Sequence, residues 1–187
     1  MGMDVHGLNP IENRKKSDFP ILVKVDKLEK EEKWKERMEL IEQSDNYHKE
    51  RNEYENANKG IYFRNNCWYW RPLWDFCYNV APELISDDLW ADGHHNSGDG
   101  LNGEDAKLLG EKLLKAVSDG FAKKFKEHHE ELEKDEEYKY PFDIENVVDF
   151  AEFCIESGGF EICQIMTIYI IVEAVRSLIK IIKELVL

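Results

Sequence analysis

Two short stretches of the chain alternate apolar and polar residues, which is the pattern of a β-strand with one buried face. Residues 1–7, with the sequence MGMDVHG, alternate in this way and are followed by the turn residues Asn9 and Pro10. Residues 160–163, FEIC, alternate as well, and residues 61–63 form a further candidate strand. The strand at 160–163 is a candidate partner for the opening strand.

The segment from residue 24 to 56 has a different pattern, with sparse apolar residues among many Glu, Lys and Arg. Most of these apolar residues are three or four positions apart, which predicts a thin apolar stripe on a helix. Residues 11–20 before it are predicted to be a loop that stops at Pro20. We expect one long helix or a helical hairpin broken near residues 44–46, forming a solvated insertion.

Apolar residues at helical spacing predict three more helices between residues 72 and 157. The first has Pro72 in its first turn, where a missing N–H is tolerated, and Pro82 can end it. The second opens at residues 104–105, and Gly120 interrupts it. Its predicted apolar face comprises Leu108, Leu109, Leu113, Leu114 and Val117.

A charged, exposed helix is expected over residues 121–137, with the pair His128-His129 in solvent. The last of the three runs from residue 144 to 157. Asp143 is a candidate N-cap, and Gly158-Gly159 supplies a stop.

The tail from residue 165 to 187 is rich in Ile, Val and Leu, with one narrow polar stripe. Its uncharged run covers only residues 163–172, whereas a membrane span needs roughly 18 apolar residues. The pattern predicts an amphipathic helix with a wide apolar face. This face can pack within its own domain, associate with a second copy of the chain, or lie on a membrane surface.

These elements predict an α+β fold that is predominantly helical, with a small sheet, packed helices and an amphipathic C-terminal helix. At 187 residues the chain suits one hydrophobic core. We therefore expect a single domain over 1–187, in which residues 11–59 are a charged helical insertion and residues 164–187 a C-terminal helical extension.

The formal net charge is −14, and charged residues make up 34% of the chain. Binding to nucleic acid requires clustered Lys and Arg, so direct nucleic-acid binding is not expected. An acidic surface can instead occupy a basic groove on another protein. The four cysteines lack the paired spacing of a zinc site and lie in apolar stretches, and no signal peptide opens the chain. These features indicate a reduced, cytoplasmic setting.

The most unusual local sequence is the glycine-rich segment 91–103, ADGHHNSGDGLNG. It lies in a stretch between Arg71 and Lys107 that has no Lys or Arg but holds eight carboxylates. Such surroundings disfavour phosphates and favour a cation or a basic partner. The segment does not match the spacing of a calcium-binding loop. The alternatives are a metal site completed from elsewhere, or a turn whose Asn and Asp side chains bond their own backbone. The oxygen and nitrogen donors in it are Asp92, His94, His95, Asn96 and Asp99.

Catalysis is a second hypothesis for the same segment. A histidine from the segment can act as a general base with Asp92 or Asp99 orienting it, and Cys67 or Cys77 can act as a nucleophile. These residues show none of the spacings of known catalytic motifs. The hypothesis is a metal-dependent enzyme centred on His94, His95 and Asp99.

A ligand pocket is a third hypothesis, based on the aromatic block at residues 62–78. Its Trp and Tyr side chains can stack on a flat ring, and the nearby Arg and Asn side chains can bind an anionic edge. The alternative is that Trp70 and Trp74 belong to the core and that Arg71 pairs with Asp75.

Four stretches resemble a family of small uncharacterised proteins of bacteriophages and prophages. They are MGMDVHGLNP at 1–10, YFRNNCWYWRPLWDFC at 62–77, ADGHHNSGDGL at 91–101 and FAEFCIESGGFEIC at 150–163. The resemblance covers about residues 1–10 and 60–163. It implies a phage-associated accessory protein in the bacterial cytoplasm, and it brings no catalytic residue. By analogy, such proteins often bind components of the host or of its defence systems.

We therefore predict a phage-derived accessory protein that binds a host or defence-system protein, or a small nucleotide-like ligand, without catalysis. We assign no catalytic residue, no metal ligand and no cofactor, and a homo-oligomer formed through residues 165–187 is one of the open alternatives. The predicted binding residues are Arg64, Asn66, Trp68, Trp70, Arg71, His94, His95, Asn96 and Asp99.

Overall fold

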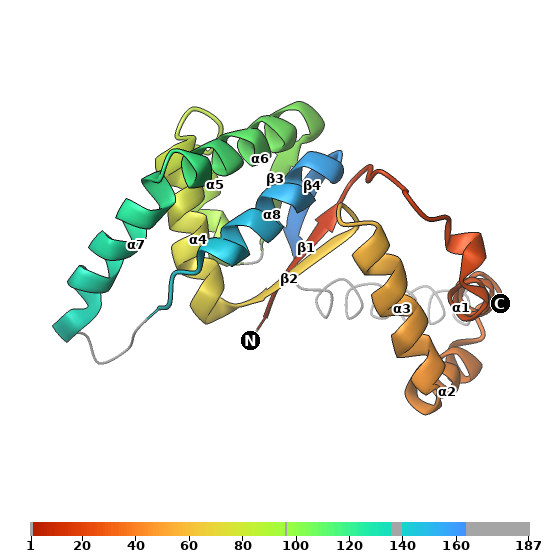
Figure 1. Cartoon of the computed structure of the whole chain (residues 1–187). Helices are drawn as coiled ribbons and strands as arrows, with labels where there is room; N and C mark the ends of the chain where they lie inside the picture. The colour runs from red at the N-terminus through yellow and green to blue at the C-terminus, as the bar shows by residue number, and fades with distance from the viewer. Residues whose placement is uncertain (1, 96, 136–139, 164–187) are drawn as a thin grey trace, which may run out of the picture.

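The computed structural model describes residues 2–95, 97–135 and 140–163. Within them the chain forms a four-stranded sheet and eight α-helices (Figure 1). The strands are β1 (Gly2–Gly7), β2 (Tyr62–Asn66), β3 (Ser97–Asn102) and β4 (Gly159–Cys163). The helices are α1 (Pro20–Lys30), α2 (Trp34–Gln43), α3 (Asp45–Ala57), α4 (Cys67–Val80), α5 (Asp87–Gly93), α6 (Gly103–Ser118), α7 (Phe121–Leu132) and α8 (Ile144–Glu156). Two 3-10 turns lie at Lys16–Asp18 and Glu133–Asp135. The predicted α+β, predominantly helical fold is confirmed.

The sheet is antiparallel, with the strand order β2-β1-β4-β3. The opening strand therefore pairs with the strand after α8, and Val5 lies opposite Ile162. Alternation along β1 places Met3 and Val5 in the core and leaves Asp4 and His6 on the other face. The two strands predicted from alternation, and their pairing, are confirmed.

The glycine-rich segment is only partly a loop, because its second half forms the edge strand β3 along β4. Gly100 allows this close approach. A Cβ atom at this position would lie 1.7 Å from the carbonyl oxygen of Phe160 in β4. The interpretation of 91–103 as a continuous loop is therefore wrong. Glycine is common in turns, but at Gly100 it allows the backbone of the neighbouring strand to come close.

The main hydrophobic core lies between the sheet and helices α4, α6 and α8 (Figure 1). The side chain of Asp143 accepts a hydrogen bond from the backbone N–H of Glu145 and caps α8, as the sequence predicts. The backbone at Gly158 and Gly159 has positive φ angles of 61° and 100°, which ends the helix and turns the chain into β4. Leu108, predicted to be in the core, is 41% exposed, and Ala106 and Ala116 occupy the buried side of α6 instead.

The charged insertion forms the three helices α1, α2 and α3, which lie beside the sheet (Figure 1). They have a small core of their own, made of Phe19, Leu22, Val25 and Tyr47. The predicted break near residue 44 is confirmed, since the hydroxyl of Ser44 caps α3. A second break at residues 31–33 was not predicted, and neither was a helix start at Pro20.

Within the residues that the structure describes, no helix combines the length and apolarity needed to cross a membrane. The amphipathic helix predicted for residues 165–187 lies outside the described residues.

Candidate functional site

Helix α4 carries the residues that define the site. Its first backbone N–H groups are capped by the side chain of Asn66, which accepts hydrogen bonds from Trp68 N at 3.0 Å and Tyr69 N at 3.1 Å. Because the helix starts at Cys67, Pro72 lies inside it and not in its first turn, which corrects the sequence prediction. Residues that are three or four positions apart share one face of a helix, and five such residues of α4 lie on its outward face. These residues are Trp68, Arg71, Asp75, Tyr78 and Asn79.

The opposite face of α4 holds the short helix α5 in place through two indole groups. Trp70 Nε1 donates to the carbonyl oxygen of Gly93 at 2.9 Å, and Trp74 Nε1 donates to that of Trp90 at 3.0 Å. Both side chains are fully buried, and their rings stack with a centroid separation of 5.5 Å. The two tryptophans therefore belong to the core and fix the position of α5 against α4.

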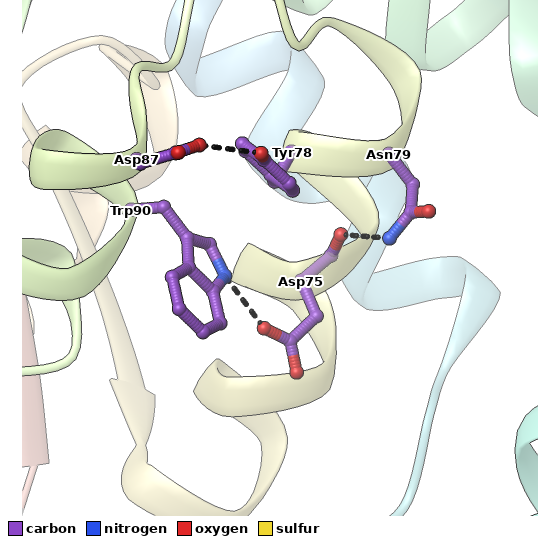
Figure 2. A pocket seen from close by; sticks show the side chains of 5 residues that line it. All are labelled: Asp75, Tyr78, Asn79, Asp87 and Trp90. Atoms are coloured by element: carbon purple, nitrogen blue, oxygen red, sulfur yellow. Dashed lines mark hydrogen bonds between the residues drawn. The ribbon is translucent and has the colours of Figure 1, made fainter.

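A shallow hollow of about 590 Å³ lies between the outward faces of α4 and α5 (Figure 2). It is lined by Asp75, Tyr78, Asn79, Asp87 and Trp90, and we call it the acidic–aromatic hollow. In Figure 2, Asp87 of α5 reaches towards the ring of Tyr78, and Asp75 of α4 reaches towards the indole of Trp90. The Tyr78 hydroxyl donates to Asp87 Oδ1 at 2.6 Å, and Trp90 Nε1 donates to Asp75 Oδ1 at 2.8 Å. The hydrogen bond to the negatively charged Asp87 raises the pKa of the Tyr78 hydroxyl.

A second hollow of about 270 Å³ adjoins the first and shares Asp75 and Trp90 with it. Its other lining residues are Arg71, Pro72, His94, His129 and Tyr140, and we call it the basic hollow. His94 Nε2 lies 3.3 Å from Asp75 Oδ1, and its ring meets that of Trp90 edge to face. Asp75 therefore separates a hollow lined by carboxylates from one lined by cationic and imidazole groups.

His129 of α7 and Tyr140 line one side of the basic hollow. Arg71 Nη1 donates to the Tyr140 hydroxyl at 2.9 Å, and the guanidinium carbon lies 5.4 Å from the centre of the Tyr140 ring. His129 Nε2 lies 2.6 Å from the Tyr140 carbonyl oxygen and 3.5 Å from a carboxylate oxygen of Glu133. The prediction that His129 is solvated is therefore wrong, since its side chain is only 19% exposed.

The carboxylates of the acidic–aromatic hollow accept hydrogen bonds from the neutral groups of Tyr78 and Trp90. Within the described part of the chain, no Lys or Arg forms an ion pair with Asp75 or Asp87, and their polar partners are Tyr78, Trp90 and His94. The absence of Lys and Arg from residues 72–106 explains this lack of ion pairs. The hollow thus offers two aromatic rings and two carboxylates that, among the described residues, form no ion pair with Lys or Arg.

The structure brings Arg71 and His94, two of the predicted binding residues, into this site. Trp68 lies at its edge, 43% exposed, with its ring centre 5.2 Å from that of Tyr140. Trp70 was predicted to bind a ligand, but its full burial among core side chains makes this prediction wrong. Asn66 acts as the cap of α4 and is exposed.

The other predicted binding residues lie elsewhere. Arg64 is exposed on β2, where its Nε lies 3.8 Å from Asp4. His95 is exposed after α5, and Asp99 is exposed on β3. Asn96 lies outside the described residues. The predicted set therefore does not form one continuous site.

Several residues of the site are absent from the predicted binding set. Tyr78 belongs to the aromatic block of the pocket hypothesis, and Asp75 was considered only as an ion-pair partner of Arg71. Both follow Arg71 at helical spacing on α4. Trp90 and Asp87 lie outside the aromatic block, and only the packing of α5 on α4 brings them close. Nothing in the local sequence links His129 and Tyr140 to Arg71.

Two of the cysteines, Cys77 and Cys154, offer little nucleophilic character. Cys77 and Cys154 are fully buried, and this burial raises the pKa of both thiols above its usual value, which disfavours the reactive thiolate. Cys67 is half-buried at the first position of α4. Among the described residues, no group of three or more His, Cys, Asp or Glu side chains is placed to hold a metal ion.

Comparison with known proteins adds no relative, since no protein-family model, curated protein or solved structure matches this chain.

Proposed function

We propose that this chain is a phage-derived accessory protein that binds a host or defence-system protein, without catalysis, through the outward face of α4 and α5. The observation that carries the proposal is the pair of adjoining hollows that share Asp75 and Trp90. Their lining is rich in Trp, Tyr and Arg, the residue types that contribute most binding energy at protein interfaces. The phage setting and the bacterial cytoplasm rest on the sequence resemblance.

The shape of the site favours a protein partner over a small molecule. Pockets for small molecules bury most of the ligand surface, whereas these two hollows are open to solvent. A nucleotide-like ligand remains the weaker proposal, because its phosphates would meet the charges of Asp75 and Asp87 as well as the cation of Arg71. The net charge of −14 also repels a negatively charged ligand of this kind.

The rival proposal, a metal-dependent enzyme centred on His94, His95 and Asp99, has less support. His94 faces Asp75 and Trp90 on the side of α4, while His95 and Asp99 are exposed. A general base requires a partner that orients it next to the reacting group. Asp75 could serve His94 in that way, but no Ser, Thr or Cys of the described residues lines the basic hollow.

A differential capture experiment tests the proposal. Tagged wild-type protein is used to capture proteins from bacterial lysates, alongside an Arg71→Ala/Asp87→Asn double variant. The control is Lys35→Ala/Glu39→Gln, which alters an exposed ion pair on α2, far from the site (Figure 1). A partner of the α4–α5 face should be recovered at least ten-fold less by the site variant and equally by the control. Equal recovery by all three proteins would overturn the proposal.

A further inference from the structure

We propose that the acidic–aromatic hollow accepts an arginine side chain of the partner protein. This inference rests on the proposed function and names the chemistry that the α4–α5 face recognises. The hollow combines two features that a guanidinium group requires, namely aromatic rings on which it can stack and carboxylates that accept its N–H groups. Both come from residues that already line one cavity of about 590 Å³.

The carboxylates of the hollow are held in place by neutral donors. Tyr78 and Trp90 each donate one hydrogen bond to one oxygen of Asp87 and Asp75, respectively. A carboxylate has about four acceptor positions on its two oxygens, so each group can still accept from an incoming cation. Tyr78 and Trp90 are uncharged, so they orient the carboxylates without neutralising them. Asp75 also has His94 Nε2 at 3.3 Å from the oxygen that Trp90 bonds, which leaves its second oxygen for a ligand.

The aromatic rings restrict the kind of cation. The rings of Tyr78 and Trp90 are 5.9 Å apart at their centres and tilted by 41°, and both are half-buried walls of the hollow. A planar guanidinium group stacks on such rings and can pair with a carboxylate through two parallel hydrogen bonds. A hydrated metal ion would gain nothing from the rings, and an anion would be repelled by both carboxylates.

The adjoining basic hollow limits where the rest of the partner can lie. Arg71 and Tyr140 occupy its rim, and a second cation from the partner would meet the Arg71 guanidinium there. The structure therefore favours a single arginine entering between α4 and α5, with neutral or acidic partner residues next to it over α4 and Tyr140. This arrangement fixes the orientation of the partner on the α4–α5 face as well as the charge of the residues that can bind there.

The test uses the full chain and the probe N-acetyl-arginine methylamide, followed by the indole ¹H–¹⁵N signal of Trp90. An exposed site of this kind binds an isolated side chain weakly, with a dissociation constant on the order of millimolar. The matched probe is N-acetyl-citrulline methylamide, which has the same shape without the charge. We expect a saturable shift with the arginine probe and at least a three-fold weaker response to citrulline.

Variants on one helix turn separate local recognition from overall charge. Asp87→Asn should weaken arginine binding at least three-fold, whereas Asp88→Asn removes the same charge from the neighbouring exposed position outside the hollow and should change it less than two-fold. Equal binding of both probes, equal effects of both variants, or no binding of the arginine probe would overturn the inference. If the probe fails while the site variant still loses its partner in the capture experiment, only this inference falls. If the site variant keeps the partner, the proposed function falls as well.

Discussion

The indole Nε1 of Trp90 donates a hydrogen bond to Asp75 Oδ1 over 2.8 Å, and this contact joins α5 to the outward face of α4. The same oxygen lies 3.3 Å from His94 Nε2, so one carboxylate organises both hollows. Through Asp75 the geometry of the acidic–aromatic hollow is coupled to that of the basic hollow. Substitutions at Asp75 should therefore affect the site and the docking of α5 together.

Asp75→Ala should lower the free energy of unfolding by about 1–2 kcal/mol, because the indole N–H of Trp90 loses its acceptor in a half-buried setting. Asp75→Asn keeps an acceptor oxygen at that position and should cost less than Asp75→Ala. Urea unfolding followed by circular dichroism measures both values. Equal losses for the two variants would show that the hydrogen bond does not contribute to stability.

Two tryptophans that lie two residues apart on α4 should respond very differently to truncation. Trp70 is fully buried and bonded to Gly93, so Trp70→Ala should lower the free energy of unfolding by about 3–5 kcal/mol. Trp68 is 43% exposed, and Trp68→Ala should lower it by less than about 1 kcal/mol. Chemical denaturation of the two variants checks this difference. Similar losses would contradict the placement of Trp70 in the core.

Gly100→Ala should destabilise the sheet, because the new Cβ atom would overlap the Phe160 carbonyl oxygen in β4. We expect a loss of about 1–3 kcal/mol and faster amide hydrogen exchange along β3 and β4. Gly2→Ala is the matched control in β1, where the nearest atom would lie at 3.4 Å. The pairing of β3 with β4 would be wrong if both substitutions had the same small effect.

His6 should make the folded state less stable under mildly acidic conditions. Burial lowers the pKa of its imidazole below 6.5, and this effect outweighs that of Asp4, which acts in the opposite direction. The unfolded chain therefore binds a proton more readily than the folded one. The contribution to stability is complete above about pH 6.5 and is lost as the pH falls through the lowered pKa of the folded state.

In His6→Gln this titrating group is absent, so the melting temperature should fall less between roughly pH 7 and pH 5 than it does in the wild type. Thermal unfolding across this pH range provides the measurement. Parallel pH profiles for the two proteins would show that His6 does not titrate differently in the folded and unfolded states.

The sequence predicted those strands and helices that are determined by neighbouring residues in the chain. Alternation around Val5 and Ile162 predicted two strands and their pairing, and the short polar side chain of Asp143 predicted the start of α8. The edge strand β3 was missed because Gly98 and Gly100 carry no alternating side chains. The requirement at Gly100 is visible only when Phe160 is beside it.

The candidate site was only partly predictable from the sequence. The main error was to place Pro72 in the first turn of the helix, whereas α4 begins at Cys67. Starting α4 at Cys67 puts Trp70 on the buried face and Asp75 on the outward face with Arg71. That division follows from helical periodicity alone. In contrast, Arg71 and Tyr140 are 69 positions apart in the sequence, and no local pattern encodes the contact between them.

Photo-crosslinking in bacterial cells detects a partner at the α4–α5 face while it is bound. Asn79 is exposed at the rim of the acidic–aromatic hollow, so Asn79→p-benzoylphenylalanine places a reactive group beside the proposed interface. The same substitution at Lys35, whose side chain is 89% exposed on α2, is the control. We expect a discrete adduct with a bacterial protein from position 79 and none from position 35. Adducts only from position 35, or none from position 79, would contradict partner binding at this face.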